Sequence, residues 1–204
     1  MRFILASASP RRKEILEGIG LAFEIITADI DETCWDFSNP ENSVSMLALE
    51  KGRAVRPKAG DDCVIIAADT VVCVDGNVMG KPRDFKDAEE MLFALSGRAH
   101  EVITGVAVLG GEKEKTFYEK TEVFFKNISA GQIKEYIKTG EPMDKAGAYA
   151  IQGLGGLFIS GIKGDFQNVV GLPLSALHET LVGDFGIDIM RKLGKGGEIN
   201  VKLF

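Results

Sequence analysis

The sequence of 204 residues lacks the marks of a membrane or exported protein. No uninterrupted apolar run approaches the roughly 20 residues that a membrane-spanning helix needs. The apolar stretch at the N-terminus is interrupted by Arg11, Arg12 and Lys13, so it lacks the hydrophobic segment of a signal peptide. We therefore expect a cytoplasmic protein with no membrane partner.

Cysteine is also scarce, and acidic residues outnumber basic ones, 30 to 24. Three cysteines stand at positions 34, 63 and 73, and none of them has C-x-x-C spacing. This pattern predicts reduced cysteines, with neither a zinc site nor a disulfide framework. The formal net charge of −6 argues against a nucleic-acid partner, because such proteins usually carry a basic surface. A small anionic ligand would need locally gathered cations or a metal ion.

The chain does have the composition of a folded domain. Hydrophobic residues make up 45% and charged residues 26% of it, as in ordinary soluble proteins. A chain of this length buries roughly 70% of the surface of its unfolded form, so it needs no metal or disulfide merely to fold. We expect a single domain over residues 1–204. The tail 189–204 has the weakest pattern, and its glycines leave open a mobile connection to a short final strand.

Strand-like and helix-like segments alternate along the chain. The predicted strands cover residues 2–7, 23–27, 63–68, 102–109, 116–125 and 157–162, and Asp75-Gly76 predicts a hairpin within 71–78. The predicted helices begin at Pro10 with Ser9 as N-cap, near residues 39–41, after Asp84, at a capping box of Ser129 and Gln132, and at Pro173. This order predicts an α/β fold with a mixed sheet.

Ligands of such sheets collect at the carboxyl ends of strands, which selects residues 7–12 and Asp69–Thr70. Residues 7–12 lead from a strand end into a helix start, whose free N–H groups favour an anion. Arg11 or Arg12 can hold phosphate oxygens there. The alternative is an ordinary capped helix with solvated arginines.

Acidic residues occur at two candidate positions. Asp69 follows a buried apolar run at the expected sheet edge, where a carboxylate must be paired or bound to a metal. It can bind Mg²⁺ or take a proton from water, and the alternative is a turn-forming Asp. The acidic run 29–32 suits a hard cation, although by itself a solvated charged face explains it better.

Two further segments complete a set of groups for nucleotide hydrolysis. In Gly80-Lys81-Pro82-Arg83 the glycine permits close approach of the backbone to a ligand, next to a lysine. Residues 143–153 combine small side chains with Gln152, whose amide can read a base edge through paired hydrogen bonds. The histidines at 100 and 178 lack ligand spacing, and we see no Ser–His–acid arrangement for acyl transfer.

Short motifs follow one another along the chain from Phe3 to about Phe185. They are Ser7-x-Ser9-Pro10-Arg11-Arg12, Asp31-Glu32, Glu50-Lys51, Ala68-Asp69-Thr70-Val71, Gly80-Lys81-Pro82, Ser96-Gly97-Arg98 and Asp165-x-x-x-Val169-x-Gly171-Leu172-Pro173. Together they resemble the Maf (septum formation protein) family of nucleoside triphosphate pyrophosphatases. The C-terminal tail from Ile189 departs from the pattern.

The resemblance implies a fold and an activity. The fold would be a long twisted mixed β-sheet flanked by helices around a central cleft, similar to inosine triphosphate pyrophosphatases, in a homodimer. The activity would be cleavage between the α and β phosphates of a nucleoside triphosphate with Mg²⁺ or Mn²⁺. The role would be house-cleaning of nucleotide pools, with a link to septum formation and cell division arrest.

The resemblance also implies roles for individual residues. Asp69 would be the proton acceptor that activates water, assisted by Lys81 and Arg12. The phosphate-binding residues would be Ser7, Ser9, Arg12, Lys51 and Lys81. Glu32 would hold the metal together with Asp69.

Positions 11, 70 and 152 distinguish subfamilies. Arg11, Thr70 and Gln152 resemble the type that acts on dTTP and UTP, whereas the 7-methyl-GTP type carries Trp, Gln and Glu there. The resemblance therefore implies dTTP, UTP and modified pyrimidine triphosphates as substrates, and an amide that can satisfy the O4 and N3–H groups of a pyrimidine is consistent with this. The alternatives are a 7-methyl-GTP pyrophosphatase and a nucleotide-sensing regulator of cell division without turnover.

Overall fold

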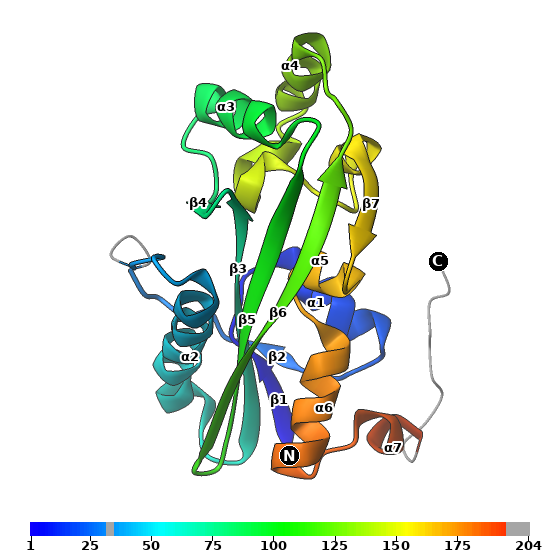
Figure 1. Cartoon of the computed structure of the whole chain (residues 1–204). Coiled ribbons are helices and arrows are strands. Elements are labelled where there is room, and N and C mark those ends of the chain that lie inside the picture. Colours follow the sequence, from blue (N-terminus) through cyan, green and yellow to red (C-terminus); the bar gives the residue numbers. More distant parts are fainter. Residues whose placement is uncertain (32–34, 195–204) are drawn as a thin grey trace.

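The computed structural model describes residues 1–31 and 35–194, and a long seven-stranded sheet runs through it (Figure 1). The strands, in sheet order, are β2 (Glu24–Ile25), β1 (Arg2–Leu5), β3 (Cys63–Val74), β5 (Ala99–Gly110), β6 (Lys113–Phe125) and β7 (Ile159–Lys163), and β4 (Asn77–Met79) pairs with β3. β1 is parallel to β2 and β3, and the other pairs are antiparallel. The predicted α/β class with a mixed sheet is confirmed.

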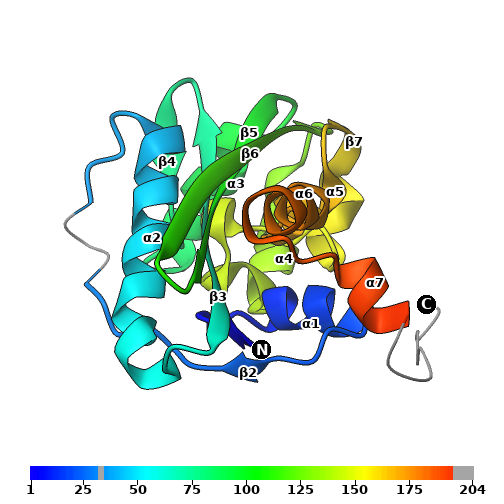
Figure 2. The same ribbon diagram turned by 90° about the horizontal axis from the view of Figure 1, so that it is seen from below.

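Helices cover both faces of this sheet. The α-helices are α1 (Pro10–Gly18), α2 (Pro40–Ala59), α3 (Phe85–Leu95), α4 (Ala130–Lys138), α5 (Phe166–Val170), α6 (Leu174–Phe185) and α7 (Ile189–Gly194). The 3-10 helices are η1 (Glu141–Asp144), η2 (Ala146–Ala148) and η3 (Leu154–Phe158). Figure 2 shows α2 on one face and α1 and α6 on the other. Within the described residues, no helix is both long and apolar enough to cross a membrane.

The side chains of β3 alternate between these two faces. Ile65 and Ala67 belong to the core cluster under α2, whereas Ile66 and Ala68 belong to the cluster under α1 and α6. Successive strand residues point to opposite faces, so the alternation extends to the polar residues that follow. Asp69 therefore faces the side of α2, and Thr70 faces the side of α1 and α5.

The prediction that Asp69 and Thr70 stand at a strand end is wrong. β3 continues from Cys63 to Val74, and Asp69 pairs with Gly105 in the middle of the long ladder to β5. Val71 and Val72, which follow Thr70, have high strand propensity and pair with Ile103 and Val102 of β5. The polar residues are thus held inside a strand and not in a turn after it.

The other edge of β3 explains why ligand chemistry is still possible there. β1 pairs with β3 only as far as Ile66, and β4 pairs with it from Val72 onward. Among the described residues, no strand pairs with this edge between residues 67 and 71. We call this stretch the uncovered edge of β3, and Asp69 lies at its centre.

Most other predicted elements are found, with small shifts. The capping box of Ser129 and Gln132 begins α4 as predicted, and Pro10 begins α1. Ser9 occupies the N-cap position of α1 but makes no side-chain cap hydrogen bond; its N–H donates to the hydroxyl oxygen of Ser7 at 3.2 Å.

The strand expected at 23–27 is shorter, at Glu24–Ile25. The strand expected at 157–162 starts two residues later, after η3, at Ile159. The tail begins with α7, and the short final strand considered for it lies outside the described residues.

Candidate active site

A cleft of about 880 Å³ opens along the uncovered edge of β3. Its lining combines the end of β1, the start of α1, α2, β3, the Gly80–Lys81 loop, residues 144–151 and the end of α5. Among the described residues that line it, five are basic and two are acidic. The basic residues are Arg11, Arg12, Lys51, Lys81 and Lys145, and the acidic ones are Asp69 and Asp144. In an acidic chain this local excess of cations favours an anionic ligand.

The side of the cleft toward α2 holds a buried ion pair. Lys51 Nζ donates to Asp69 Oδ1 at 2.7 Å, and each residue is 9% exposed. Removal of Lys51 would leave the Asp69 carboxylate buried without this cation. The predicted association of Lys51 and Asp69 in one site is therefore present in the structure.

The position of Lys51 depends on how closely α2 approaches the sheet. Gly105 pairs with Asp69 across the ladder, and a Cβ atom at Gly105 would overlap the backbone of Val44 and Ser45 in α2. Glycine is thus the residue that lets this part of α2 lie directly on β5. The sequence analysis did not single out this glycine, because the need for it arises only from tertiary contact.

The side of the cleft toward α1 holds the guanidinium of Arg12 in several hydrogen bonds. Nη1 donates to Ser7 Oγ at 3.1 Å and to the carbonyl of Ala68 at 2.8 Å. Nη2 donates to Thr70 Oγ1 at 3.0 Å, and Nε donates to the carbonyl of Gly171 at 2.8 Å. The Ala68 carbonyl belongs to the uncovered edge of β3, so Arg12 takes the place of a strand partner there.

Behind Arg12, neutral polar groups form a buried chain that the sequence analysis missed. Thr70 Oγ1 lies 2.9 Å from Thr104 Oγ1, whose hydroxyl donates to the carbonyl of Asn168 at 3.0 Å. Asn168 Nδ2 donates to Val102 O and to Thr121 Oγ1, both at 3.0 Å. These contacts anchor α5, whose end supplies the Gly171 carbonyl to Arg12. Asn168 lies inside the Asp165–Pro173 motif, and this position is the sequence feature that could have pointed to it.

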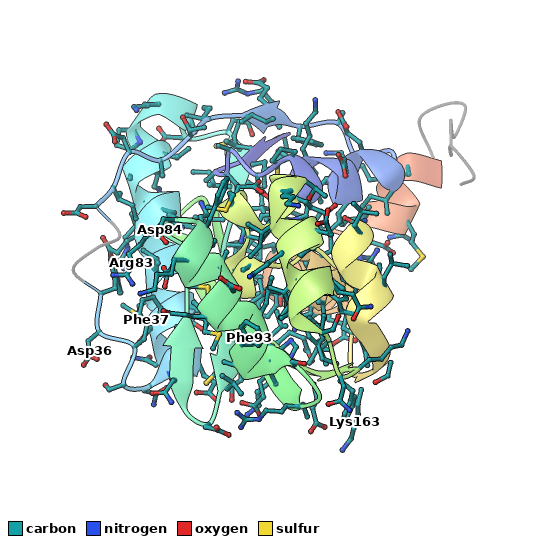
Figure 3. All side chains as sticks on the ribbon, turned by 90° about the horizontal axis from the view of Figure 1, so that it is seen from above. Asp36, Phe37, Arg83, Asp84, Phe93 and Lys163 are labelled. Carbon is teal, nitrogen blue, oxygen red and sulfur yellow. The ribbon has the colours of Figure 1, made fainter. Side chains whose placement is uncertain are left out.

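The remaining predicted phosphate ligands also line the cleft. Ser7 is buried, Ser9 is half-buried and Lys81 is exposed. The Gly80 carbonyl accepts from Gly147 N–H at 3.1 Å, which joins the Lys81 loop to η2. Figure 3 labels Phe37, another lining residue, in the segment before α2, on the same side of the molecule as Arg83 and Asp84.

The predicted specificity residues are only partly together. Arg11 and Thr70 line the cleft, whereas Gln152 is exposed and its neighbour Ile151 is the residue that lines it. The Nε atoms of Arg11 and Arg12 donate to the adjacent carbonyls of Val170 and Gly171, but Arg12 also contacts β3, whereas Arg11 Nη1 lies 3.9 Å from Asp144 Oδ2. The role of Gln152 stays a prediction.

Asp144 also contacts Lys145, so it joins two cations of the cleft. Burial by itself raises the pKa of the Asp144 carboxyl, but the hydrogen bond and charge of Lys145, and then Arg11, outweigh it and lower that pKa. Burial lowers the pKa of the Arg11 guanidinium, against the opposing charge of Asp144. Lys145 lies in the candidate segment 143–153, in which the sequence assigned a role to Gln152 alone.

Of the two predicted metal ligands, the structure describes Asp69. Glu32 lies outside the described residues, and within the described residues no group of three or more His, Cys, Asp or Glu side chains could hold a metal ion. Asp69 is a hard oxygen donor inside the cleft. This fits Mg²⁺, which is commonly held by one or two carboxylates together with the phosphates of a substrate.

Comparisons with solved structures find Ham1 proteins. The Staphylococcus aureus Ham1 protein aligns with a TM-score of 0.44 and 15% identity, over 61% of this chain and 72% of that one. A Ham1 protein from Coxiella burnetii aligns with a TM-score of 0.45 and 18% identity, over 61% and 73%.

Sequence relatives are far more similar. A protein of Bacillus cytotoxicus named dTTP/UTP pyrophosphatase is 48% identical over 180 residues, covering 88% of this chain and 94% of the relative. A protein of Bacillus cereus with the same name is 47% identical over 188 residues, covering 92% and 97%. The family profile described as Maf-like protein matches residues 2–183, nearly the whole length, and this chain therefore belongs to the Maf-like proteins.

Proposed function

We propose that this chain is a pyrophosphatase that hydrolyses dTTP and UTP to the nucleoside monophosphate and pyrophosphate. The observation that carries the proposal is the buried Asp69–Lys51 pair in a cleft with an excess of cations. The two relatives named dTTP/UTP pyrophosphatase support the choice of substrate.

The chemistry assigned to Asp69 is that of a general base. A water oxygen attacks the α-phosphorus in line with the bond to the bridging oxygen of the β-phosphate. That bond breaks, pyrophosphate leaves, and the proton of the water passes to the Asp69 carboxylate. Lys51 holds Oδ1 of Asp69, so the proposal assigns the water to Oδ2.

The phosphates would be bound mainly from the opposite side of the cleft. Arg12 presents a guanidinium fixed by Ser7, Ala68, Thr70 and Gly171, so little side-chain entropy remains to be lost on binding. Lys81 is exposed on its loop and can offset charge on the departing pyrophosphate. The start of α1, with Ser9 at its N-cap position, adds N–H donors.

A divalent cation, Mg²⁺ or Mn²⁺, belongs to the proposal. Asp69 would hold it together with the substrate phosphates, and Glu32 is the second predicted ligand. When bound, the ion neutralises part of the triphosphate charge. The proposal also keeps the homodimer and the cytoplasmic location expected from the sequence.

The decisive experiment measures pyrophosphate and orthophosphate release from a panel of triphosphates with Mg²⁺ or Mn²⁺. We expect pyrophosphate from dTTP and UTP and none from 7-methyl-GTP. Asp69→Asn keeps the shape of the side chain but removes the base, and it should lower kcat by at least about 100-fold. Nucleotide binding, measured by calorimetry, should persist.

Asp184→Asn is the matched control, because Asp184 also pairs with a lysine, Lys115, at 2.7 Å but lies outside the cleft. It should leave turnover unchanged. Orthophosphate as the sole product, turnover of 7-methyl-GTP in place of pyrimidine nucleotides, or nucleotide binding without turnover by the intact chain would each overturn the proposal.

A further inference from the structure

Three side chains in the lining of the cleft, those of Arg11, Asp144 and Lys145, form an ordered array. Lys145 Nζ donates to Oδ1 of Asp144, and Arg11 Nη1 approaches Oδ2 at 3.9 Å. The carboxylate therefore lies between two cations, one on each oxygen. Read across the array, the order of groups is hydrogen-bond donor, acceptor, donor.

This order is the complement of one kind of base edge. Uracil and thymine present O4, N3–H and O2, which are an acceptor, a donor and an acceptor. Cytosine presents an amino group, a bare N3 and O2, so two of its three groups are reversed. A site that hydrogen-bonds one pattern discriminates against the reversed pattern, because donors then face donors and acceptors face acceptors.

The array is placed and held as a binding element would be. Its three residues line the same cleft as Asp69. Arg11 and Arg12 are neighbours on α1 with different partners, because Arg11 approaches Asp144 and Arg12 donates to the Ala68 carbonyl. Lys145 is 14% exposed in its side chain. Its N–H donates to the Pro142 carbonyl at 3.1 Å, which fixes the link between η1 and η2.

The backbone that follows Lys145 is also held in place, by contacts of Gly147. Gly147 has a φ of +67° and bonds to the Gly80 carbonyl, and a Cβ atom at Gly147 would overlap Val72 of β3. The segment that carries Asp144 and Lys145 is therefore pressed onto the sheet. Ala150 and Ile151 follow in the lining and offer apolar surface to the flat face of a base.

We propose that Arg11, Asp144 and Lys145 read the uracil or thymine edge of the substrate, with the Asp144 carboxylate accepting from N3–H. The inference rests on the proposed function and deepens it by naming the base-reading residues. It assigns to Asp144 and Lys145 a contact that sequence considerations assigned to Gln152, which is exposed outside the lining.

The test compares kcat/KM for UTP, CTP and N3-methyl-UTP in the wild-type chain and in Asp144→Asn. The wild-type chain should prefer UTP over the other two by about tenfold or more. An amide can accept from N3–H or donate to a bare N3, so Asp144→Asn should lower the UTP-to-CTP ratio by about tenfold. The penalty for N3-methylation should shrink when Asp144 is replaced by Ala.

Asp75→Asn is a closely matched control. The Asp75 side chain is 65% exposed and pairs with Arg98, while that of Asp144 is 64% exposed and pairs with Lys145. Asp75→Asn should leave the UTP-to-CTP ratio unchanged. Lys145→Met should lower kcat/KM for UTP, because one carbonyl of the base loses its donor, and unchanged UTP kinetics would remove Lys145 from the array.

The outcomes separate this inference from the proposed function. If the wild-type chain releases no pyrophosphate from UTP, the proposed function fails. If UTP is hydrolysed but Asp144→Asn keeps the wild-type UTP-to-CTP ratio within about twofold, the base-reading array is wrong while the pyrophosphatase stands. Melting temperatures of all variants show whether a change in ratio accompanies a loss of folding.

Discussion

The two faces of β3 hold their polar groups in different ways at adjacent residues. Toward α2, Asp69 and Lys51 are two opposite charges in direct contact, both buried. Toward α5, Thr70, Thr104 and Asn168 are neutral groups joined by hydrogen bonds, and they end at one charged group, the Arg12 guanidinium. One strand thus supplies a reactive carboxylate on one face and a rigid support for Arg12 on the other, and the two groups have separate neighbours.

Removing one partner of the Asp69–Lys51 ion pair should have the largest effect on stability and turnover. Lys51→Met leaves the Asp69 carboxylate buried without its cation, so the free energy of unfolding should fall by about 3 kcal/mol, and turnover of UTP by at least about 100-fold. Urea unfolding and pyrophosphate release measure the two effects. The double variant Lys51→Met with Asp69→Asn should regain much of the stability but none of the turnover.

Lys163→Met is the control for removing a lysine. Lys163, labelled in Figure 3, is 83% exposed in its side chain and lies 4.0 Å from Glu122. An exposed pair of this kind contributes about 0–1 kcal/mol. If Lys51→Met were no more destabilising than Lys163→Met, the charged pair would not be the feature that distinguishes this face.

Protonating His100, on the face of β3 that holds Thr70, should have the next largest effect on the free energy of unfolding. His100 lies on that face, is 2% exposed, and its Nε2 lies 2.8 Å from the Tyr149 hydroxyl. Burial lowers the pKa of His100 from 6.5 to about 4, and burial also raises the pKa of Tyr149, so both stay neutral near pH 7.

The sign of the pH effect follows from that pKa. Between pH 6.5 and pH 4 the unfolded chain binds a proton at His100 that the folded chain does not, so acid destabilises the fold. This group alone should remove about 2 kcal/mol between pH 7.5 and pH 5. Urea unfolding of His100→Gln should show a shallower acid dependence than the wild-type chain, and His178→Gln serves as control. Parallel curves for His100→Gln and the wild-type chain would contradict the prediction.

The smallest effect should come from one hydroxyl of the neutral chain. Thr104→Val keeps the shape but removes the contacts to Thr70 and Asn168, which should lower the free energy of unfolding by about 1 kcal/mol. Because Thr70 helps to fix Arg12, kcat/KM for UTP should also fall, by about tenfold. Thr180→Val removes a hydroxyl bonded within α6, and it should leave kcat/KM unchanged. Equal kinetics of the two variants would show that the chain supports the fold alone.

Much of the fold could be predicted because local signals and tertiary contacts agree. The capping box at Ser129, Pro10 at the start of α1 and the alternating strands are local features, and each is found in the structure. The continuity of β3 through Asp69 could not be predicted, because it depends on pairing with β5, which is distant in the sequence.

The site was predictable only where its residues carry a distinct pattern. Ser7, Arg12, Lys51 and Asp69 belong to recognisable motifs, and the structure brings them together. Thr104 and Asn168 are common residues whose importance comes from burial and partners, which a sequence does not display. The role of Gln152 stays a prediction, since its amide suggested base recognition and the structure shows it exposed, next to Ile151 in the lining.

The alternation of Asp69 and Thr70 between faces also constrains how this chain can vary in length. Deleting or inserting one residue in β3 ahead of Asp69 would exchange the two side chains, sending the carboxylate toward Arg12 and the hydroxyl toward Lys51. A change of length in the β5–β6 turn near Gly111 imposes no such exchange on β3. Single-residue insertions should therefore abolish activity in β3 ahead of Asp69 and be tolerated in the β5–β6 turn. A screen of single-residue insertions at both positions would test this difference.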